Sequence, residues 1–569
     1  MNKYSRVIAS KSRFRITNMV TAILLIGMMT FSLVACSSGY EEGKDYGNLS
    51  KKDANKTLDA YLSKIDAYEI DAPIDISGNE TPVAELPDIG IYPLSVDGSG
   101  SINIEIFSST EKSSTGNDGW LNEVATAFND SGATIDGKSV NVSIRPIASG
   151  LALDYITTGK YIPDAFSPAN ELWGQMIESK NIPLTKVENR LAGNTAGILM
   201  KQSVYDKFKE EYSDVNLTNA LKAAMAGDIT LAYTNPYASS TGLNMLTAML
   251  HEFDPENPLS EKAQQALLDF QALSPPVAFT TAQMRESAKN GMVDAMIMEY
   301  QAYINEPTLK NFVFTEMGVR HDSPVYTFED TSADKTAGLK LFTEYAKSDS
   351  MQKMASDFGF NANDAYQAQN PGLDGAGLYA AQDIWKEKKD GGKPVIAVFV
   401  ADISGSMDGS RINALKESLI NGAQYIGENN YIGLVSYSDD VYINLPIDKF
   451  SGQQRAKFNG AVKEFSVEGG TATYDGVLVG LDMLRTAEEK YPGARTMLFV
   501  LSDGEQNEGY NFKKVAPVIA ALNVPIHTIG YEANIDELKK LSAINEASAT
   551  DANEKDIVYN LKNIFNAQI

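Results

Sequence analysis

One short segment carries the clearest pattern of this chain, an apolar run that leads into oxygen-bearing side chains: Val395-Ile396-Ala397-Val398-Phe399-Val400-Ala401-Asp402-Ile403-Ser404-Gly405-Ser406. The apolar run is typical of a strand buried on both faces, as in a parallel sheet covered by helices. Directly after it, one carboxylate and two hydroxyls stand at alternate positions. Such hard oxygens are the ligands that Mg²⁺, Mn²⁺ and Ca²⁺ prefer. The segment therefore predicts a divalent-metal site at the end of a buried strand.

Two later segments carry further oxygen-bearing side chains. They read Gly469-Gly470-Thr471-Ala472-Thr473-Tyr474-Asp475 and Leu501-Ser502-Asp503-Gly504, the second after the apolar residues 496–500. In a doubly wound sheet, loops at the carboxyl ends of neighbouring strands converge on one crevice. We therefore predict one metal site made by Asp402, Ser404, Ser406, Thr471 and Asp503, with Thr473 as a substitute for Thr471. Taken singly, each segment is also explained by a helix N-cap or a turn.

In this order the three segments resemble the von Willebrand factor A (VWA) domain, whose metal-ion-dependent adhesion site (MIDAS) uses Asp-x-Ser-x-Ser, a Thr and an Asp. The resemblance implies that Ser404 and Ser406 bind the metal directly. It implies that Thr471 binds directly or through water, and that Asp402 and Asp503 hold coordinated waters or bind directly. A sixth position would stay open for an acidic residue of a protein partner. The resemblance covers residues 394–569 and implies a doubly wound, Rossmann-like α/β fold.

The remaining pattern along the chain also favours α/β architecture, because strand-like and helix-like stretches alternate. In residues 99–385 we expect strands at 102–107, 140–147, 196–200, 229–234, 294–298 and 312–317, and helices at 120–128, 243–253 and 334–358. In residues 394–569 we expect further strands at 431–437, 441–447, 497–501 and 526–529, and helices at 411–427, 536–544 and 554–565. The charged, glycine-bearing residues 386–393 are expected to be a linker.

Four stretches of the middle domain carry a second resemblance: 102–107 ending in Ser108-Ser109-Thr110, 163–170 with Trp173 beyond it, 235–242, and 293–300. They are similar to the type II extracytoplasmic solute-binding proteins of ABC importers, with the molybdate-binding kind nearest. The resemblance implies a two-lobed domain that holds a small solute between its lobes. The candidate ligand-binding residues are Ser108, Ser109, Ser167, Ser239, Ser240, Thr241 and Tyr300.

The hydroxyls of residues 239–241 precede an apolar helix, and together with its first amides they could bind an oxyanion. A plain helix N-cap explains the same residues equally well. The family usually has a serine where this chain has Pro168, which offers neither an N–H nor a hydroxyl. The cleft could therefore have kept the fold and changed its ligand.

The N-terminus has the features of an export signal and a lipid attachment site. Residues 1–35 carry five basic and no acidic residues, and 19–34 are apolar over a length that suits a secretory signal. Leu33-Val34-Ala35-Cys36 resembles the lipobox of bacterial lipoproteins, which implies cleavage before Cys36 and lipidation of its thiol. An uncleaved membrane anchor is the alternative. Residues 36–98 then read as a tether and linker with one short helix around 54–65.

Composition excludes several functions. The chain has 569 residues and a formal net charge of −25, which argues against a nucleic-acid partner. Cys36 is the single cysteine, so neither a disulfide nor a cysteine-based zinc site can form. The three histidines lie far apart, and no arrangement of a catalytic acid, base or nucleophile is visible. We therefore predict a binding protein and not an enzyme.

Together these features predict a lipoprotein on the extracytoplasmic side of a bacterial cell membrane. Its VWA domain would bind a protein partner through a divalent ion, Mg²⁺ first, with Mn²⁺ and Ca²⁺ as alternatives. The solute-binding domain would serve to sense a solute or to dock the protein onto another molecule. The alternative function is the substrate-binding component of an ABC importer for a small solute or oxyanion, with an accessory VWA domain.

Overall fold

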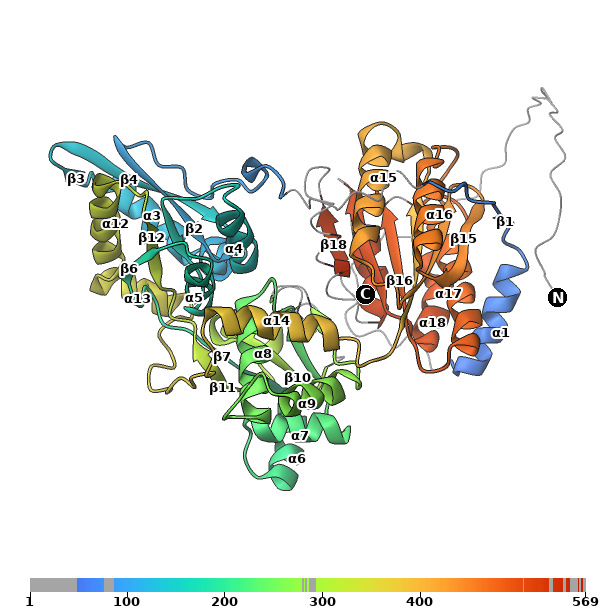
Figure 1. Cartoon of the computed structure of the whole chain (residues 1–569), viewed down its shortest axis with the longest axis horizontal. Helices are drawn as coiled ribbons and strands as arrows, with labels where there is room; N and C mark the ends of the chain where they lie inside the picture. The colour runs from blue at the N-terminus through green and yellow to red at the C-terminus, as the bar shows by residue number, and fades with distance from the viewer. Residues whose placement is uncertain are drawn as a thin grey trace, which may run out of the picture.

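The computed structural model describes residues 49–75, 86–278, 281, 284–285, 293–504, 506–531, 536–545, 549–552, 561 and 564–565. Three sheets of seven, five and six strands organise this part of the chain, and helices cover them (Figure 1). The expected signal peptide 1–35 and the lipidation at Cys36 lie outside the described residues. Among the helices that are described, none is long and apolar enough to span a membrane.

The six-stranded sheet forms the first lobe of the middle domain, with the order β3-β4-β2-β5-β12-β6. Its strands are β2 (Ile102–Ser108), β3 (Thr134–Ile135), β4 (Lys138–Pro146), β5 (Ala165–Ser167), β6 (Leu184–Glu188) and β12 (Val325–Phe328). Its helices are α2 (Thr110–Ser113), α3 (Trp120–Asp130), α4 (Ser149–Thr158), α5 (Leu172–Ser179), α12 (Ala333–Ala346) and α13 (Asp349–Asp357). Strands β4, β2 and β5 run parallel, so the loops that follow them lie at one edge of the sheet.

The five-stranded sheet forms the second lobe, with the order β11-β7-β10-β8-β9. Its strands are β7 (Thr195–Lys201), β8 (Leu231–Thr234), β9 (Val277–Ala278), β10 (Ala295–Glu299) and β11 (Phe312–Arg320). Its helices are α6 (Gln202–Tyr212), α7 (Leu217–Ala226), α8 (Ser240–Phe253), α9 (Glu261–Gln271) and α11 (Tyr300–Ile304). The chain crosses between the lobes at 189–194 and 321–324, and α14 (Gly375–Lys388) contacts α5 in one lobe and α8 in the other.

The prediction of one continuous helix over 334–358 is wrong, because two helices occupy this stretch. Helix α12 ends at Ala346 and α13 begins at Asp349. Between them, Ser348 adopts an extended conformation that interrupts the helical backbone and starts the next helix.

The seven-stranded sheet forms the C-terminal domain, with the order β1-β15-β14-β13-β16-β17-β18. Its strands from the last third of the chain are β13 (Val395–Asp402), β14 (Tyr431–Tyr437), β15 (Val441–Lys449), β16 (Arg495–Ser502), β17 (Ile526–Tyr531) and β18 (Ala549–Ala552). Its helices are α15 (Ser410–Gly422), α16 (Gly452–Lys463), α17 (Thr473–Lys490), α18 (Phe512–Leu522) and α19 (Asp536–Ser542). Strands β14 and β15 form the expected hairpin, and most of the expected helix 554–565 lies outside the described residues.

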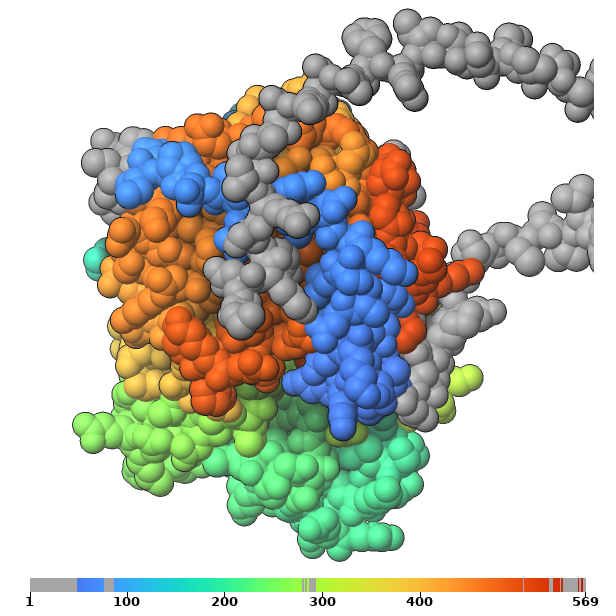
Figure 2. Space-filling model, turned by 90° about the vertical axis from the view of Figure 1, so that its right-hand side faces the viewer, coloured from blue at the N-terminus to red at the C-terminus, as the bar shows by residue number. Residues whose placement is uncertain are grey.

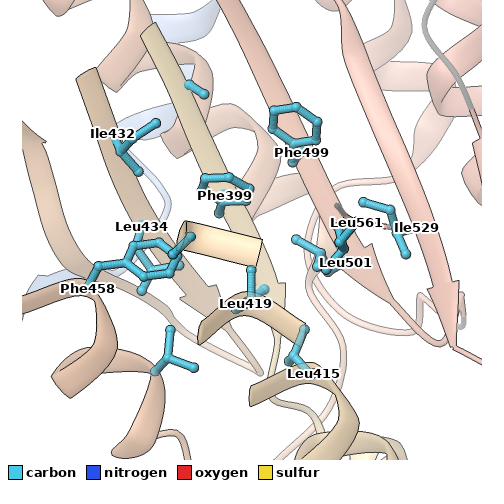
Figure 3. Close-up of a cluster of buried hydrophobic side chains, with 14 of the residues drawn as sticks. Phe399, Leu415, Leu419, Ile432, Leu434, Phe458, Phe499, Leu501, Ile529 and Leu561 are labelled. Atoms are coloured by element: carbon cyan, nitrogen blue, oxygen red, sulfur yellow. The ribbon is translucent and has the colours of Figure 1, made fainter. Parts of the chain in front are cut away.

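The central strand of this sheet is buried on both faces, as the sequence predicts. Every residue of β13 is buried. Phe399 packs with Phe499 and Leu419 in the cluster on one face, and Val398 and Val400 belong to the cluster on the other (Figure 3). Because side chains of a strand alternate between faces, the unbroken apolar run supplies both clusters at once.

The N-terminal segment is not the linker that we expected from its sequence. Helix α1 (Lys51–Leu62) lies against α17 and α18, where Ala54 and Leu58 are completely buried. Strand β1 (Ala67–Glu69) pairs in parallel with β15 and becomes the edge of the C-terminal sheet. Figures 1 and 2 show this blue segment on the orange and red domain. The apolar side of α1 finds its core here, so the chain builds part of this domain before it enters the middle domain.

The expected linker 386–393 is also held by contacts on both sides. Lys389 is buried and donates to Asp390, which in turn accepts from Arg495 at the start of β16. On the side of the middle domain, Lys393 Nζ donates to the Ala272 carbonyl oxygen at 2.9 Å. Residues 386–393, called the joint below, therefore lie at the amino-terminal ends of β13 and β16, where ion pairs position them.

Candidate metal site at the C-terminal sheet

The two predicted carboxylates, Asp402 and Asp503, lie at the same edge of the sheet because their strands are neighbours. Strands β13 and β16 run parallel with Ala401 opposite Leu501, so Asp402 and Asp503 follow at the same edge of the sheet. Asp402 Oδ1 accepts from the Ser404 N–H at 2.9 Å, and its Oδ2 accepts from the Ser502 hydroxyl at 2.6 Å. These two bonds hold the buried Asp402 carboxylate in one orientation.

The predicted serines lie beside this carboxylate. The hydroxyl oxygens of Ser404 and Ser406 are 3.0 Å apart. Ser404 is fully buried, whereas Ser406 is exposed at the surface. The short turn that follows β13 therefore carries one hydroxyl inside the site and one at its mouth.

Residues 468–472, which carry Thr471 and are called the threonine loop below, join the site through backbone hydrogen bonds. The Gly405 N–H donates to the Gly469 carbonyl oxygen at 3.1 Å, and the Glu468 N–H donates to the Ile403 carbonyl oxygen at 2.9 Å. Gly469 has a φ of +61°, a backbone conformation that glycine adopts without strain. Thr471 follows this turn and is buried. All three predicted segments are thus brought together, and Thr473 begins α17 beside them.

Three residues that were not predicted from the sequence contact the candidate ligands: Asn507, Ser502 and Arg411. Asn507 Oδ1 accepts from the Thr471 N–H at 2.8 Å, and Ser502 holds Asp402 as described. Arg411 Nη1 donates to Asp503 Oδ2 at 3.3 Å and to the Ser406 carbonyl oxygen at 2.9 Å. Ser502 and Arg411 stand next to motif residues and could have been noticed. Asn507 carries no sequence signal, since its role depends on how its loop folds.

The site is short of positive charge. Burial raises the pKa of Asp402 to about 6, and the charge of Asp503 adds to this effect. Asp503 is 2% exposed, and its Oδ1 atom has no hydrogen-bond partner among the described residues. An ionised oxygen buried without a partner is costly unless a cation compensates it.

These groups fit a divalent cation. Two carboxylates and three hydroxyls are hard oxygen donors, and Arg411 bonds to only one oxygen of Asp503, so Oδ1 has no hydrogen-bond partner among the described residues. Within the described part of the chain, no three His, Cys, Asp or Glu side chains gather into a metal-binding group. A metal at this place would therefore depend on the hydroxyls of Ser404, Ser406 and Thr471 as much as on the acids.

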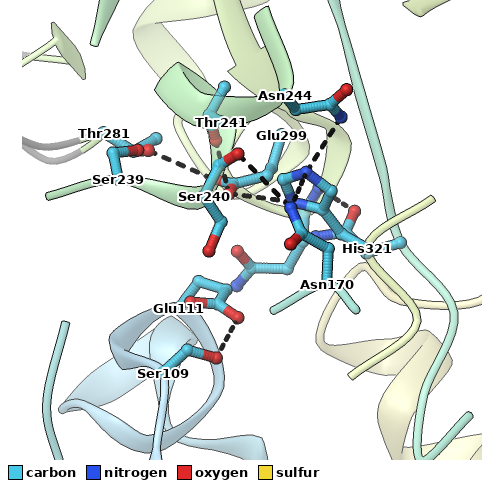
Figure 4. A network of polar contacts seen from close by, with 12 residues as sticks. Ser109, Glu111, Asn170, Ser239, Ser240, Thr241, Asn244, Thr281, Glu299 and His321 are labelled. Carbon is cyan, nitrogen blue, oxygen red and sulfur yellow. Dashed lines mark hydrogen bonds and ion pairs between the residues drawn. The ribbon is translucent and has the colours of Figure 1, made fainter. Parts of the chain in front are cut away.

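In the middle domain, four of the predicted ligand residues lie near the place where the two lobes meet (Figure 4): Ser109, Ser239, Ser240 and Thr241. Ser240 Oγ accepts from the Trp173 indole N–H at 2.8 Å and donates to Ser149 at 3.2 Å. Thr241 donates to Glu299 at 2.5 Å. Ser239 caps helix α8, and Tyr300 packs against aromatic neighbours. The hydroxyls at the start of α8 are therefore engaged by the protein itself.

The other predicted serines surround a lysine that the sequence reasoning did not single out. Lys112 is fully buried, and its Nζ donates to Ser109 Oγ and, at 2.9 Å, to the Ser167 carbonyl oxygen. Burial lowers the pKa of Lys112 to about 8, although Glu111 stands 3.7 Å away and opposes the shift. Ser167 Oγ is buried without a hydrogen-bond partner among the described residues, and Ser108 is buried as well.

A buried contact between His321 and Glu299 belongs to a polar network that connects the lobes. His321 Nδ1 lies 3.2 Å from Glu299 Oε1, while its Nε2 contacts the side-chain amides of Asn170 and Asn244. Burial would raise the pKa of Glu299, but His321 and the hydroxyl of Thr241 hold it below its usual value. Since Asn170 belongs to the first lobe and Glu299 to the second, the network ties the lobes together.

Comparison with known families identifies both domains. Residues 397–568 match the von Willebrand factor type A domain, and residues 113–361 match the bacterial extracellular solute-binding protein family. The chain therefore combines a solute-binding-type domain with a C-terminal VWA domain, which confirms the prediction from the sequence. Both are α/β domains, as expected.

Similarity to individual proteins is limited to single domains. An uncharacterized protein of Synechocystis is 25% identical over 159 residues, which are 27% of this chain and 37% of that protein. Human inter-alpha-trypsin inhibitor heavy chain H3 is 30% identical over 125 residues, 21% of this chain and 14% of that one. The matched region thus spans well under half the length of these relatives.

Solved structures resemble the two domains separately. The von Willebrand factor type A protein of Catenulispora acidiphila has a TM-score of 0.29 at 19% identity, covering 31% of this chain and 42% of that one. Iron-bound HitA of Pseudomonas aeruginosa has a TM-score of 0.37 at 14% identity, covering 51% and 99%. The substrate-binding domain of a molybdenum transporter of Clostridium difficile has 0.30 at 14%, covering 46% and 98%.

Proposed function

We propose that this protein binds a protein partner through a divalent metal ion held at the edge of its C-terminal sheet. The observation that carries the proposal is that the loops of the five predicted ligands lie at one edge of the sheet, where Asp503 Oδ1 is buried without a hydrogen-bond partner among the described residues. These ligands are Asp402, Ser404, Ser406, Thr471 and Asp503. A binding role, and not catalysis, is what this set of donors supports.

The proposed metal would be held by the two aspartates and the three hydroxyls, with Mg²⁺ first and Mn²⁺ or Ca²⁺ as alternatives. When bound, it would supply a positive charge that attracts a carboxylate from the partner. The chain's own groups prepare the site: Ser502 orients Asp402, and Asn507 holds the backbone at Thr471.

The position of the site also favours binding to another molecule. The joint to the middle domain contacts the start of β16 through Asp390 and Arg495, whereas Asp402 and Asp503 follow the ends of β13 and β16. Strand β13 has eight residues, which corresponds to about 25 Å. The site therefore points away from the joint, so a partner can approach it without meeting the solute-binding domain there.

We further propose that the protein works on the extracytoplasmic side of a bacterial membrane, anchored by lipid at Cys36. The match to an extracellular solute-binding family supports the location. Because residues 49–75 pack on the C-terminal domain, a tether from Cys36 would reach the VWA domain first. The solute-binding domain would then stand farther along the chain and serve in sensing or docking.

A second function, delivery of a small solute to an ABC importer, is favoured by one observation. Lys112 is buried beside Ser109 and Ser167, and the Ser167 hydroxyl has no hydrogen-bond partner among the described residues. A thermal-shift screen of oxyanions, sugars and amino acids tests it. A ligand that stabilises the full-length protein but not its Lys112→Met variant would support transport, and no shift across the panel would count against it.

Metal binding tests the main proposal. Isothermal titration calorimetry of the full-length protein in mild detergent, with Mg²⁺ and Mn²⁺, should show one site. We expect Asp503→Asn to lose this site while its circular dichroism stays unchanged. The control is Asp448→Asn, an exposed aspartate at the opposite end of the sheet, which should bind like the wild type. Equal affinity in Asp503→Asn and wild type would refute the assignment.

A further inference from the structure

Acidic side chains surround the proposed metal site. We define the acidic rim as Asp408, Asp439, Asp440, Glu468 and Glu508, which lie in the loops that build the site and are exposed or half-exposed. From this rim we infer the chemistry of the partner: a protein segment whose metal-binding Asp or Glu is flanked by lysine or arginine residues. The inference rests on the proposed metal-dependent function and adds the partner's charge pattern to it.

Two rim residues stand on either side of the threonine loop. Asp439 Oδ1 accepts from the Gly470 N–H at 2.7 Å. A side chain at Gly470 would come within 2.7 Å of Asp439 Oδ1 and 2.8 Å of Glu508 Cγ, so both acids border the backbone directly before Thr471. The Glu508 N–H also donates to the Thr471 carbonyl oxygen at 3.2 Å. These contacts place two exposed carboxylates next to a proposed metal ligand.

Glu468 and Asp408 border the loop after β13, and Asp440 lies next to Asp439 in the turn between β14 and β15. Glu468 bonds through its N–H to the Ile403 carbonyl oxygen, and Asp408 follows Ser406 by two positions. Burial raises the pKa of Asp440, and the charges of Asp66, Asp439 and Glu468 add to the shift. The shift is consistent with repulsion among Asp440, Asp439 and Glu468.

Little basic charge offsets the rim. In the described residues of the loops 402–411, 438–442, 466–475 and 502–510, Arg411 is the one lysine or arginine. Its guanidinium already donates to Asp503 and to the Ser406 carbonyl oxygen. A bound metal ion would offset the buried pair Asp402 and Asp503, which leaves the five rim carboxylates without a matching cation.

The charge pattern selects among partners. A carboxylate that approaches the metal must pass the rim, where an acidic segment would be repelled. Basic residues on either side of that carboxylate would instead meet rim carboxylates while the acid reaches the centre. Charges arranged in this way favour association and exclude wrong partners. The proposed metal therefore selects a partner's Asp or Glu, and the acidic rim selects lysine or arginine residues beside that carboxylate.

Synthetic peptides test the inference directly. Three fluorescent peptides share one scaffold: a central Asp flanked by lysines, a central Asp flanked by glutamates, and a central Asn flanked by lysines. Binding to the full-length protein in detergent is measured by anisotropy with Mn²⁺ at low salt. We expect the lysine-flanked Asp peptide to bind at least about tenfold more tightly than either of the others, and EDTA to abolish its binding.

Charge reversal on the protein supplies the matching half of the test. Asp408→Lys combined with Glu508→Lys should invert the preference, so that the glutamate-flanked peptide binds more tightly. The control reverses two exposed acids at the opposite end of the sheet, Glu428→Lys with Asp448→Lys, and should keep the original preference. Both pairs change the net charge equally, so a difference between them reports position and not total charge.

The outcomes separate this inference from the proposed function. If calorimetry finds no Mn²⁺ site, the proposed function fails. If Mn²⁺ binds and the Asp peptides bind without regard to flanking charge, the inference alone fails. It also fails if the lysine-flanked Asn peptide binds as tightly as the Asp peptide, or if Asp439→Asn removes a second bound cation, since the rim would then be a cation site.

Discussion

The Gly405 N–H donates to the Gly469 carbonyl oxygen at 3.1 Å, and this bond joins the turn after β13 to the turn before α17. The two glycines lie far apart in the sequence, yet the bond brings Ser404 and Ser406 next to the loop of Thr471. Neither glycine carries a ligand atom in its side chain. The candidate site therefore depends on backbone contacts between loops as well as on the predicted ligands.

Asn507→Ala should weaken metal binding without unfolding the domain. The substitution removes the acceptor of the Thr471 N–H, so the loop that presents the Thr471 hydroxyl becomes less restrained. We expect about a tenfold lower Mg²⁺ affinity by calorimetry, within the range seen when groups that orient metal ligands are removed. The exposed Glu428→Gln, at the opposite end of the sheet, serves as the control and should leave the affinity unchanged.

Arg411→Gln should strengthen metal binding. The guanidinium bonds to Asp503 Oδ2 and adds a positive charge beside a site that a cation would occupy. Without this competing charge, Mg²⁺ and Mn²⁺ should bind several-fold more tightly at low salt, and the gain should shrink as salt screens the interaction. A lower affinity in the variant would mean that Arg411 helps to hold Asp503 in its binding position.

Leu58→Ala should destabilise the C-terminal domain and leave the middle domain unaffected. Leu58 is fully buried on α1, and truncating such a leucine costs about 2–5 kcal/mol. The chain has three tryptophans, Trp120, Trp173 and Trp385, and all lie in the middle domain or in α14. The variant should therefore shift the unfolding transition seen by far-UV circular dichroism but not the one seen by tryptophan fluorescence.

The exposed Lys52→Ala on the same helix is the matched control for Leu58→Ala and should shift neither transition. If Leu58→Ala also leaves both transitions unchanged, α1 does not contribute to the folded C-terminal domain.

The buried His527 should lower the stability of the C-terminal domain as the pH falls below about 6.5, and the raised pKa of Asp402 opposes this change below pH 6. Burial and the charge of Arg495 lower the pKa of His527 from 6.5 to about 3. Between these values the unfolded chain binds a proton that the folded chain does not, so acid favours unfolding by up to about 1.4 kcal/mol per pH unit. Above pH 6.5 this contribution is constant.

His527→Phe should remove this component of the pH dependence. The ring of His527 stacks on Phe499 at 5.1 Å, so an aromatic replacement suits the site. Urea unfolding followed by circular dichroism at pH 5 and pH 7 measures the change. The same slope in the variant and the wild type would show that other groups cause it.

Strand patterns predicted the fold class, and they predicted that the loops carrying the candidate ligands would lie together. The run 395–401 is typical of a strand covered on both faces, and it is one. Because β13 and β16 run parallel as neighbours, the oxygens at their ends share one edge of the sheet. The roles of Asn507, Lys112 and Arg411 were not predicted from the sequence, because they depend on which loops and lobes contact one another. A single polar side chain has no periodic pattern by which its neighbours could be recognised.

The amino-acid sequence alone therefore determined the two α/β domains and the order of the segments that carry the candidate ligands Asp402, Ser404, Ser406, Thr471 and Asp503, because local order along strands dictates where loops emerge. That these residues bind a metal stays a prediction. Only the folded chain showed that residues 49–75 belong to the C-terminal domain, that the joint is held by Asp390 and Arg495, and that an acidic rim surrounds the site. These features arise from contacts between segments distant in sequence, where many pairings are compatible with the same local patterns and packing selects one.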